Sequence, residues 1–201
     1  ATATLDVEAA RAAVTERTAA ILPVHLFGTP CAAADLEALA AKRGLLLLED
    51  AAQALGATIA GRPAGSFGTV STLSLGHFKN VSTLQGGALL VDDEDLAARM
   101  RAMASSWPRP SRAALLRSWM AWALFGLATR ADLFSLVVHP LLSLPELLSP
   151  GWTGRVAHRP EASYASGELD LNACKRGFLA AQARLGVRSL GAAKRNTEVR
   201  A

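Results

Sequence analysis

Apolar runs alternate with helix-patterned segments along the first hundred residues. Four runs are short and rich in aliphatic side chains, as buried strands are: residues 19–28, 45–50, 69–76 and 86–93. Between them, apolar side chains recur at helical spacing in residues 6–17, 32–44 and 93–104. Strands that alternate with helices are typical of an α/β fold, so we expect a mainly parallel sheet with flanking helices.

The alternation ends at residue 104. A linker with two prolines, SSWPRPSR, precedes a block dense in Leu, Trp, Phe and Val that extends to about residue 150. Its longest charge-free runs, 118–129 and 133–145, are shorter than the roughly 20 apolar residues that a membrane-spanning helix needs. Two interpretations stay open: a pair of buried or interface helices, or peripheral membrane contact through residues 110–150.

The membrane interpretation assigns a place to each kind of side chain in this block. Trp119, Trp122 and Phe125 would lie among the acyl chains of one leaflet. The arginines would lie near lipid phosphates, and they are Arg109, Arg112, Arg117 and Arg130.

Composition and charge exclude several classes of protein. Hydrophobic residues make up 51% of the 201 residues and charged residues 19%, which is enough to bury a sizeable core. The net charge of +4 is mild, and no basic block with interleaved aromatics suggests a nucleic-acid partner. Cys31 and Cys174 lack the spacing of a metal site or a disulfide framework. We therefore expect a cytoplasmic protein with no structural metal.

Polar side chains stand where apolar runs end. Asp50 ends LLLLED, Gln53 follows three residues later, Ser74 lies in STLSLG, and Lys79 comes five residues after it. The carboxyl ends of parallel strands meet at one edge of a sheet, so we expect these groups to line one pocket. A carboxylate, an amide, a hydroxyl and an amine together suit a cofactor with an aldehyde, a ring nitrogen and a phosphate, which describes pyridoxal phosphate (PLP).

The segments EDAAQALGA (49–57) and SLGHFKN (74–80) resemble the DegT/DnrJ/EryC1/StrS family of PLP-dependent sugar aminotransferases. The resemblance runs from about residue 18 to 101 and returns weakly at QARLGVRSL (182–190). It implies a type I PLP-transferase fold, of the aspartate aminotransferase type, of which this chain would be a large-domain fragment from the central portion of a longer protein.

The resemblance also implies a role for each of the four polar residues. Lys79 occupies the position of the lysine that forms the Schiff base and later acts as a base. Asp50 occupies the position of the carboxylate that pairs with the pyridine nitrogen. Gln53 occupies the position that contacts the cofactor ring, and Ser74 the position that binds the phosphate.

The function implied by this resemblance is conversion of a keto sugar, commonly nucleotide-linked, to an amino sugar by a homodimer, with glutamate as the amino donor. Such a reaction belongs to polysaccharide, glycolipid or secondary-metabolite biosynthesis. Two alternatives stay open: a non-catalytic, truncated or degenerate homologue, and a PLP-dependent sugar dehydratase or lyase. Because a lysine stands at position 79, we favour transamination.

The pattern and the resemblance together divide the chain into three parts. We expect a PLP-binding core in residues 1–104, a hydrophobic helical insertion in residues 105–154, and a loop with a helix leading toward a small domain in residues 155–201.

Overall fold

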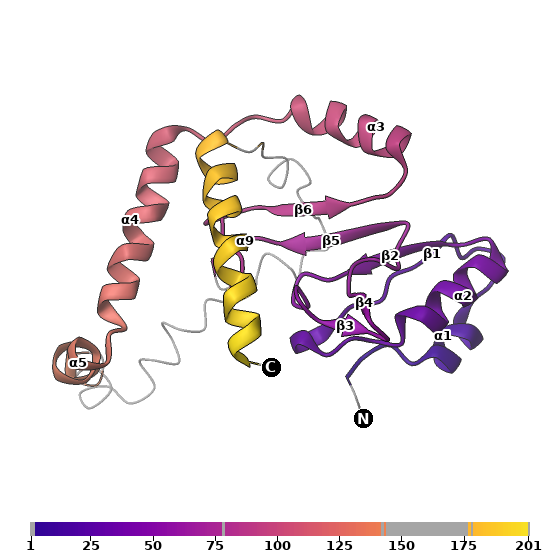
Figure 1. The fold of residues 1–201 in the computed structure, drawn as a ribbon, viewed down its shortest axis with the longest axis horizontal. Helices are drawn as coiled ribbons and strands as arrows, with labels where there is room; N and C mark the ends of the chain where they lie inside the picture. Colours follow the sequence, from indigo (N-terminus) through magenta and orange to yellow (C-terminus); the bar gives the residue numbers. More distant parts are fainter. Residues whose placement is uncertain (1–2, 78, 142, 144–176, 178, 201) are drawn as a thin grey trace. The chain divides into compact units, whose positions relative to one another are not determined.

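The computed structural model describes all residues except 1–2, 78, 142, 144–176, 178 and 201 (Figure 1). It contains two compact units. The first consists of residues 1–107 together with 177–201, and the second of residues 108–176.

A four-stranded sheet forms the centre of the first unit. Its strands are β1 (Ala20–Ile21), β2 (Leu46–Asp50), β5 (Val70–Ser74) and β6 (Gly87–Leu90), in the order β1-β2-β5-β6. The first three run parallel, and β6 pairs antiparallel with β5. The sheet is mainly parallel and has helices beside it, which confirms the expected α/β class (Figure 1).

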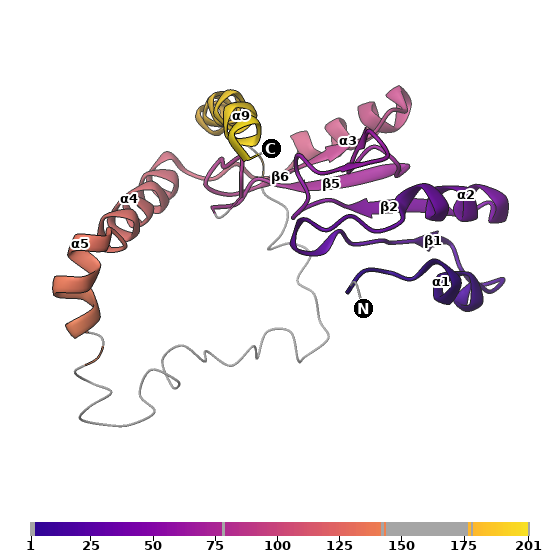
Figure 2. The same cartoon turned by 60° about the horizontal axis from the view of Figure 1, so that its bottom comes forward.

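Helix α2 (Ala33–Arg43) packs against β1 and β2 (Figure 2). One buried cluster joins the helix to the two strands, and it includes Ile21, Leu36, Leu39 and Leu47. Alternate residues of a strand point to opposite faces of the sheet, so Leu47 marks the face that α2 covers. The helix ends at Gly44, whose φ of 64° is the left-handed conformation that glycine adopts without strain.

Two further helices begin at aspartates, as local capping rules predict. Asp6 caps α1 (Val7–Ala13), and its carboxylate accepts a hydrogen bond from the Ala9 N–H at 2.8 Å. Asp93 caps α3 (Glu94–Ser105) in the same way, by accepting from the Leu96 N–H at 2.7 Å. Helix α1 lies inside the expected range 6–17, and α3 extends one residue past the expected range 93–104.

Residues 19–28 do not form the long strand that their apolar run suggests. Regular pairing stops after Ile21, and only an isolated bridge between Val24 and Asp50 continues the parallel register. Pro23 has no N–H to donate to a ladder. The chain then turns into a short 3-10 helix, η1 (Leu26–Gly28), in which Phe27 has a φ of 54°.

A small hairpin follows β2. Strands β3 (Thr58–Ile59) and β4 (Arg62–Pro63) pair antiparallel around Ala60 and Gly61. Both turn residues have positive φ, 49° and 83°, as tight two-residue hairpin turns require.

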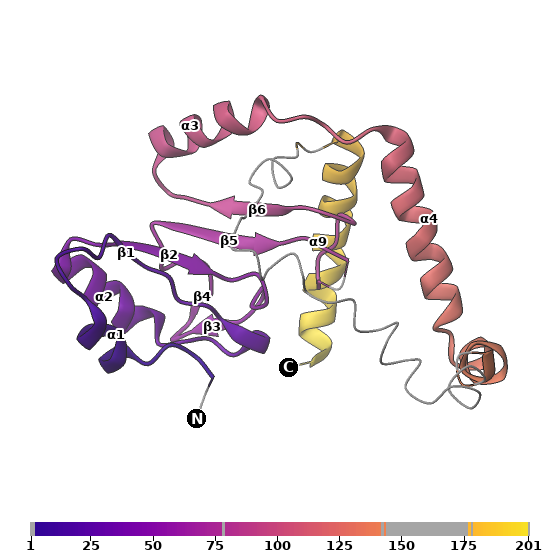
Figure 3. The ribbon, with the colours of Figure 1, turned by 180° about the vertical axis from the view of Figure 1, so that it is seen from behind.

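Helix α9 (Ala180–Arg200) lies beside the ends of β5 and β6 (Figure 3). Its side-chain contacts to this region come from Gln182 and Ser189. The helix expected within residues 155–201 begins at Ala180. Residues 155–176 and 178, with the loop expected there, lie outside the described residues.

The second unit contains α4 (Arg112–Ala128), a single turn α5 (Ala131–Leu133) and a π-helical segment η2 (Phe134–Val138). Within the described ranges, no single helix is long and apolar enough to cross a membrane. Residues Arg112–Ala128 and Ala131–Leu141 pass that test only as a pair, by length and composition, and they are bent by 68° at the break. The expected division into parts 1–104, 105–154 and 155–201 stays a prediction.

Candidate active site

Asp50 and Ser74 are the last residues of two adjacent parallel strands. In the register of β2 and β5, Asp50 lies opposite Thr72. Residues two apart in a strand share a face, so Ser74 lies on the same face as Thr72 and Asp50, one pleat further toward the carboxyl edge. This face is opposite to the one that α2 covers at Leu47.

The carboxylate of Asp50 is oriented by two hydrogen bonds to the same oxygen. Oδ1 accepts from the Thr72 hydroxyl at 3.2 Å and from the Ala52 N–H at 3.0 Å. The side chain is half-buried. Among the described residues Oδ2 has no hydrogen-bond partner, so this oxygen remains available to a cationic or N–H group of a ligand.

Gln53 connects the loop after β2 with the turn after β1. Its Oε1 accepts a hydrogen bond from the Phe27 N–H at 2.9 Å. Phe27 has a φ of 54°, and the residue is 84% exposed. Because the oxygen is used, the amide nitrogen of Gln53 is the atom that could contact a ligand.

Lys79 lies in the loop that joins β5 to β6. Its backbone N–H donates to the Gly76 carbonyl at 3.3 Å, which closes a turn. The side-chain amide of the neighbouring Asn80 donates to the Leu55 carbonyl at 3.4 Å. The loop between β5 and β6, called the lysine loop below, is therefore hydrogen-bonded to the loop that contains Gln53. Lys79 itself is half-buried and has no ion-pair partner within the described part of the chain.

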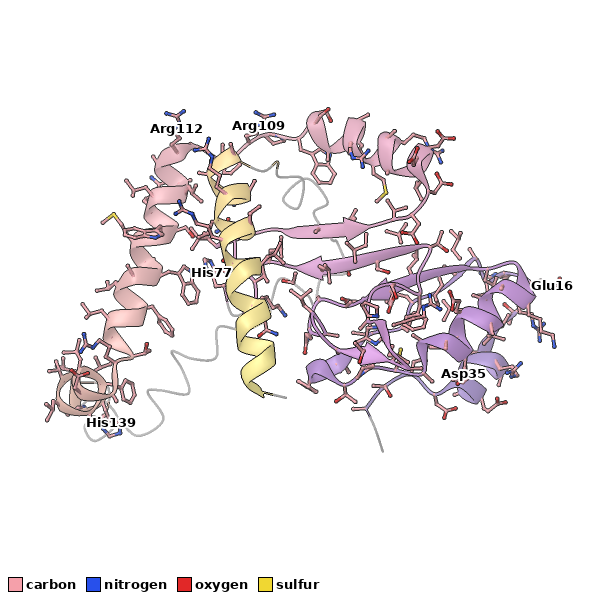
Figure 4. The ribbon with its side chains drawn as sticks, in the orientation of Figure 1. Glu16, Asp35, His77, Arg109, Arg112 and His139 are labelled. Carbon is pink, nitrogen blue, oxygen red and sulfur yellow. The ribbon has the colours of Figure 1, made fainter. Side chains whose placement is uncertain are left out.

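Ser74 begins the same loop. Its hydroxyl accepts a weak hydrogen bond from the Gly76 N–H at 3.5 Å and is half-buried. If an anion replaces this weak bond, the Ser74 hydroxyl and the Gly76 N–H can both donate to it. His77, in the same loop (Figure 4), is also half-buried, and burial lowers the pKa of its imidazole.

The end of the lysine loop is buried, and α9 braces it. The Thr83 hydroxyl donates to the Gln85 carbonyl at 2.8 Å, and its N–H donates to the Leu75 carbonyl at 2.9 Å. Gln182 of α9 is 4% exposed and donates to the Thr83 and Gln85 carbonyls, each at 3.4 Å. The Thr83 side chain is 1% exposed, so the loop has a firm base although its middle is accessible.

A buried carboxylate directly before Asp50 organises the loops around the strand ends. Glu49 is 1% exposed and accepts five hydrogen bonds, between 2.7 and 3.1 Å. The donors are the ring of His25, the backbone N–H groups of Gly65, Phe67 and Gly68, and the Ser71 hydroxyl. Burial raises the pKa of Glu49, but these hydrogen bonds outweigh burial, so the pKa lies below its ordinary value.

His25 links this carboxylate to the turn after β1. Its Nδ1 accepts from the Cys31 N–H at 3.1 Å, so Nε2 carries the proton and donates to Glu49 at 2.7 Å. His25 is fully buried and packed, in agreement with its position in an apolar run. Burial and the negative charge of Glu49 raise the pKa of the Cys31 thiol to about 11, so Cys31 stays a protonated core residue.

Thr72, Glu49 and the contacts from α9 were not predicted from the sequence. Glu49 stands beside Asp50 in LLLLED, and strand alternation puts these two acids on opposite faces. The alternation of strand residues therefore indicates that Glu49 and Asp50 have separate roles. No local pattern indicates Thr72 or Gln182, because their partners are distant in the sequence.

The donor set of this edge fits PLP. Within the described part of the chain, one oxygen of the Asp50 carboxylate has no partner and could pair with a ring N–H, and the Lys79 amine has no ion pair and could bind an aldehyde. The Ser74 hydroxyl, beside a backbone N–H, could bind a phosphate. The fit rests on the kinds of group and on their placement at adjacent loops.

Comparison with known proteins identifies the family. The model of the DegT/DnrJ/EryC1/StrS aminotransferase family matches residues 1–115. A GDP-perosamine synthase from Caulobacter vibrioides is 41% identical over 108 residues, which are 54% of this chain and 29% of the synthase. A UDP-N-acetyl-3-dehydro-alpha-D-glucosamine 3-aminotransferase from Acidithiobacillus ferrooxidans is 42% identical over 99 residues, which are 48% of this chain and 27% of that enzyme.

Solved structures agree. An aminotransferase from Psychrobacter cryohalolentis is 38% identical with a TM-score of 0.51, over 54% of this chain and 28% of that one. A GDP-4-keto-6-deoxymannose-3-dehydratase with a trapped PLP–glutamate geminal diamine is 34% identical with a TM-score of 0.50, over 53% and 28%. The chain thus spans less than a third of these relatives. It belongs to the DegT/DnrJ/EryC1/StrS aminotransferase family, and its sheet is part of the type I PLP-transferase fold.

Proposed function

We propose that the protein is a PLP-dependent aminotransferase that converts a nucleotide-linked keto sugar to an amino sugar, with glutamate as the amino donor. We place this reaction in polysaccharide, glycolipid or secondary-metabolite biosynthesis. Membership of the family supports the reaction class, and the names of the relatives support a sugar substrate. The observation that carries the proposal is the carboxylate of Asp50, held through Oδ1 at the strand edge, with no partner for Oδ2 among the residues that the structure describes.

Each residue of the site has a distinct task in this proposal. PLP, when bound, supplies a ring that accepts electrons from the α-carbon of the amino donor. Asp50 holds the proton of the ring nitrogen and so keeps the ring cationic. Ser74 binds the phosphate, and the Gln53 amide contacts the ring. Lys79 would hold the cofactor by condensing with its aldehyde, with loss of water. Once the amino donor replaces Lys79 at that carbon, the freed amine would move a proton from the donor α-carbon.

Covalent labelling tests the position of Lys79. The protein is saturated with PLP, reduced with borohydride and digested, and mass spectrometry locates the phosphopyridoxyl group. We expect the group on Lys79 and a yellow absorbance band before reduction. Lys79→Ala should lose both, whereas Lys42→Ala, at an exposed position of α2, should keep both. A label on another lysine, or none, would reject the assignment of Lys79.

A sugar dehydratase is the second candidate, because a dehydratase is among the structural relatives at a TM-score of 0.50. Product analysis separates the two reactions. Transamination adds an amino group to the sugar and retains its hydroxyl groups, whereas dehydration removes a hydroxyl group. We favour transamination because Lys79 is present to move the proton. Chromatography of the sugar product with mass detection measures the difference.

We also propose that the active form is a homodimer in the cytoplasm. Cys31 is a free, buried cysteine, which suits a reducing compartment. Light scattering on the PLP-bound protein tests the dimer, and a monomer with full activity would argue against it.

A further inference from the structure

Helix α4 presents apolar side chains on all sides. Leu116, Trp119, Met120 and Leu124 are each more than half exposed, and Phe125 and Leu127 are each 49% exposed. Phe125 follows Leu116 by nine positions, which is about two and a half helical turns, so these two side chains point in opposite directions. No residue of α4 is buried.

This distribution favours lipid over a protein partner. A protein surface that docks on a helix covers one side and leaves the other in water, so its target helix has one apolar stripe. A helix that is apolar around its whole circumference needs an apolar environment on every side. Acyl chains provide such an environment, because they surround an inserted helix completely.

The charges around the helix have the sign that anionic lipids require. Residues 105–143 contain four arginines and a single acidic residue, Asp132. Asp132 is 3.3 Å from the guanidinium of Arg130, so the aspartate is already paired. Arg109, Arg112 and Arg117 are exposed. Figure 4 shows Arg109 and Arg112 projecting at the end where α4 begins.

The spacing of these charges argues for insertion into one leaflet. Residues 118–129 are free of charge and span about 18 Å as a helix, whereas the hydrocarbon core is about 30 Å thick. If α4 and residues 131–141 crossed the bilayer together, Arg130 and Asp132 would lie in the hydrocarbon core, where charges are expensive. With the helix in one leaflet, arginines at both of its ends reach the headgroups.

We propose that α4 and the following bent segment, residues 131–141, form a monotopic anchor that inserts into one leaflet of an anionic bilayer. The apolar circumference of α4 lies among the acyl chains, and Arg112, Arg117 and Arg130 contact lipid phosphates. The anchor places the protein on a membrane surface, and it does not depend on the reaction proposed above.

Vesicle flotation of the full chain tests the anchor. The probes are vesicles of phosphatidylcholine alone and vesicles of equal parts phosphatidylcholine and phosphatidylglycerol. We expect flotation with the anionic vesicles, weaker flotation with the neutral ones, and a decrease at high salt. Equal binding to both vesicle types would contradict the proposal that the arginines contact anionic lipids.

Two pairs of variants separate the apolar and the charged contribution. Trp119→Glu should weaken binding at least about tenfold, whereas Met103→Glu, at an exposed position of α3, should leave it unchanged. The double variant Arg112→Gln and Arg117→Gln should weaken binding to anionic vesicles by more than about tenfold, at about fivefold for each charge. Arg99→Gln with Arg101→Gln removes the same charge from α3 and should have little effect. Circular dichroism verifies that each variant folds.

Depth and oligomeric state decide between the remaining outcomes. The fluorescence of Trp119 is the part of the signal that Trp119→Phe removes. Lipids brominated near the headgroup should quench this fluorescence more strongly than lipids brominated near the chain ends. The reverse order would overturn one-leaflet insertion. If the wild type ignores vesicles and Trp119→Glu instead changes its mass in light scattering, α4 is a protein interface and the proposal fails.

Discussion

Asp50 depends on its neighbour in the next strand for orientation. The Thr72 hydroxyl and the Ala52 N–H both bind Oδ1, which leaves Oδ2 for a ligand. A carboxylate held in this way loses less conformational freedom when it pairs with a ring nitrogen. Thr72 is exposed, so its side chain contributes more to the orientation of Asp50 than to the stability of the core.

Removal of the Thr72 hydroxyl should therefore impair the reaction and spare the fold. We expect Thr72→Val to lower kcat about fivefold, since one hydrogen bond to a charged group is lost, and to change stability by less than about 0.5 kcal/mol. Thr72→Ser keeps the hydroxyl and should have the kcat of the wild type. Steady-state kinetics and urea unfolding measure the two effects, and a variant that unfolds more readily at unchanged kcat would contradict the positioning role.

Glu49 has a structural role of a different kind, and its effect depends on pH. Because hydrogen bonds hold the pKa of Glu49 below the ordinary 4.5, its carboxylate stabilises the fold above that value. The stabilisation is lost as the pH falls through the lowered pKa of the folded state. Glu49→Gln should cost about 3 kcal/mol near neutral pH, since the buried donors lose a charged acceptor.

The difference between wild type and Glu49→Gln should become smaller as the pH falls below 4.5. Urea unfolding at a series of pH values measures it. Glu37→Gln is the control, because Glu37 pairs with Arg62 at the surface and should change stability by less than about 1 kcal/mol. A pH-independent difference for Glu49→Gln would show that its charge does not stabilise the fold.

At the scale of elements, α9 supports the loop that contains Lys79. Gln182 and Ser189 donate hydrogen bonds to backbone carbonyls of this loop, and Gly186 allows the backbone of α9 to lie close to the loop. A Cβ at Gly186 would lie 2.9 Å from Cγ2 of Thr83, whose side chain is buried. For Gly191, in the same helix, the described residues place no atom within 4 Å of such a Cβ.

These two glycines make a matched pair for mutation. Alanine is the better helix former by about 1 kcal/mol, so Gly191→Ala should stabilise the protein by up to that amount. Gly186→Ala gains the same propensity but must displace Thr83, and we expect net destabilisation of about 1 kcal/mol. Urea unfolding compares the two variants. Equal stabilisation by both would mean that α9 does not pack closely on the loop.

Local signals also explain which elements were predictable. The helices at 32–44 and 93–104 have a glycine stop or an aspartate cap within their own sequence, and both were found near their true ends. Residues 19–28 were misjudged as one strand, because an apolar run does not reveal where pairing stops. There, Pro23 and the bond between Phe27 and Gln53 decide the path of the chain.

At the scale of the whole molecule, binding of the cofactor should couple to stability. A ligand that binds only the folded state stabilises it by about 2.7 kcal/mol at a concentration of one hundred times its dissociation constant. We expect PLP to raise the Tm of the protein, and pyridoxal without the phosphate to raise it less, because Ser74 then has no anion to bind. Lys79→Ala should reduce the shift with PLP. Differential scanning fluorimetry measures the shifts, and equal shifts with the two ligands would argue against the phosphate site.

The sequence by itself determined the α/β alternation, the capped helices and the polar residues at the strand ends, because periodicity and caps depend on neighbouring residues. It also indicated the family through EDAAQALGA and SLGHFKN. Only the tertiary structure showed the Glu49–His25 pair, the Thr72 contact to Asp50 and the brace from Gln182. These partners are 24, 22 and 99 positions apart, and a hydrogen bond over such a distance leaves no periodic trace in the chain.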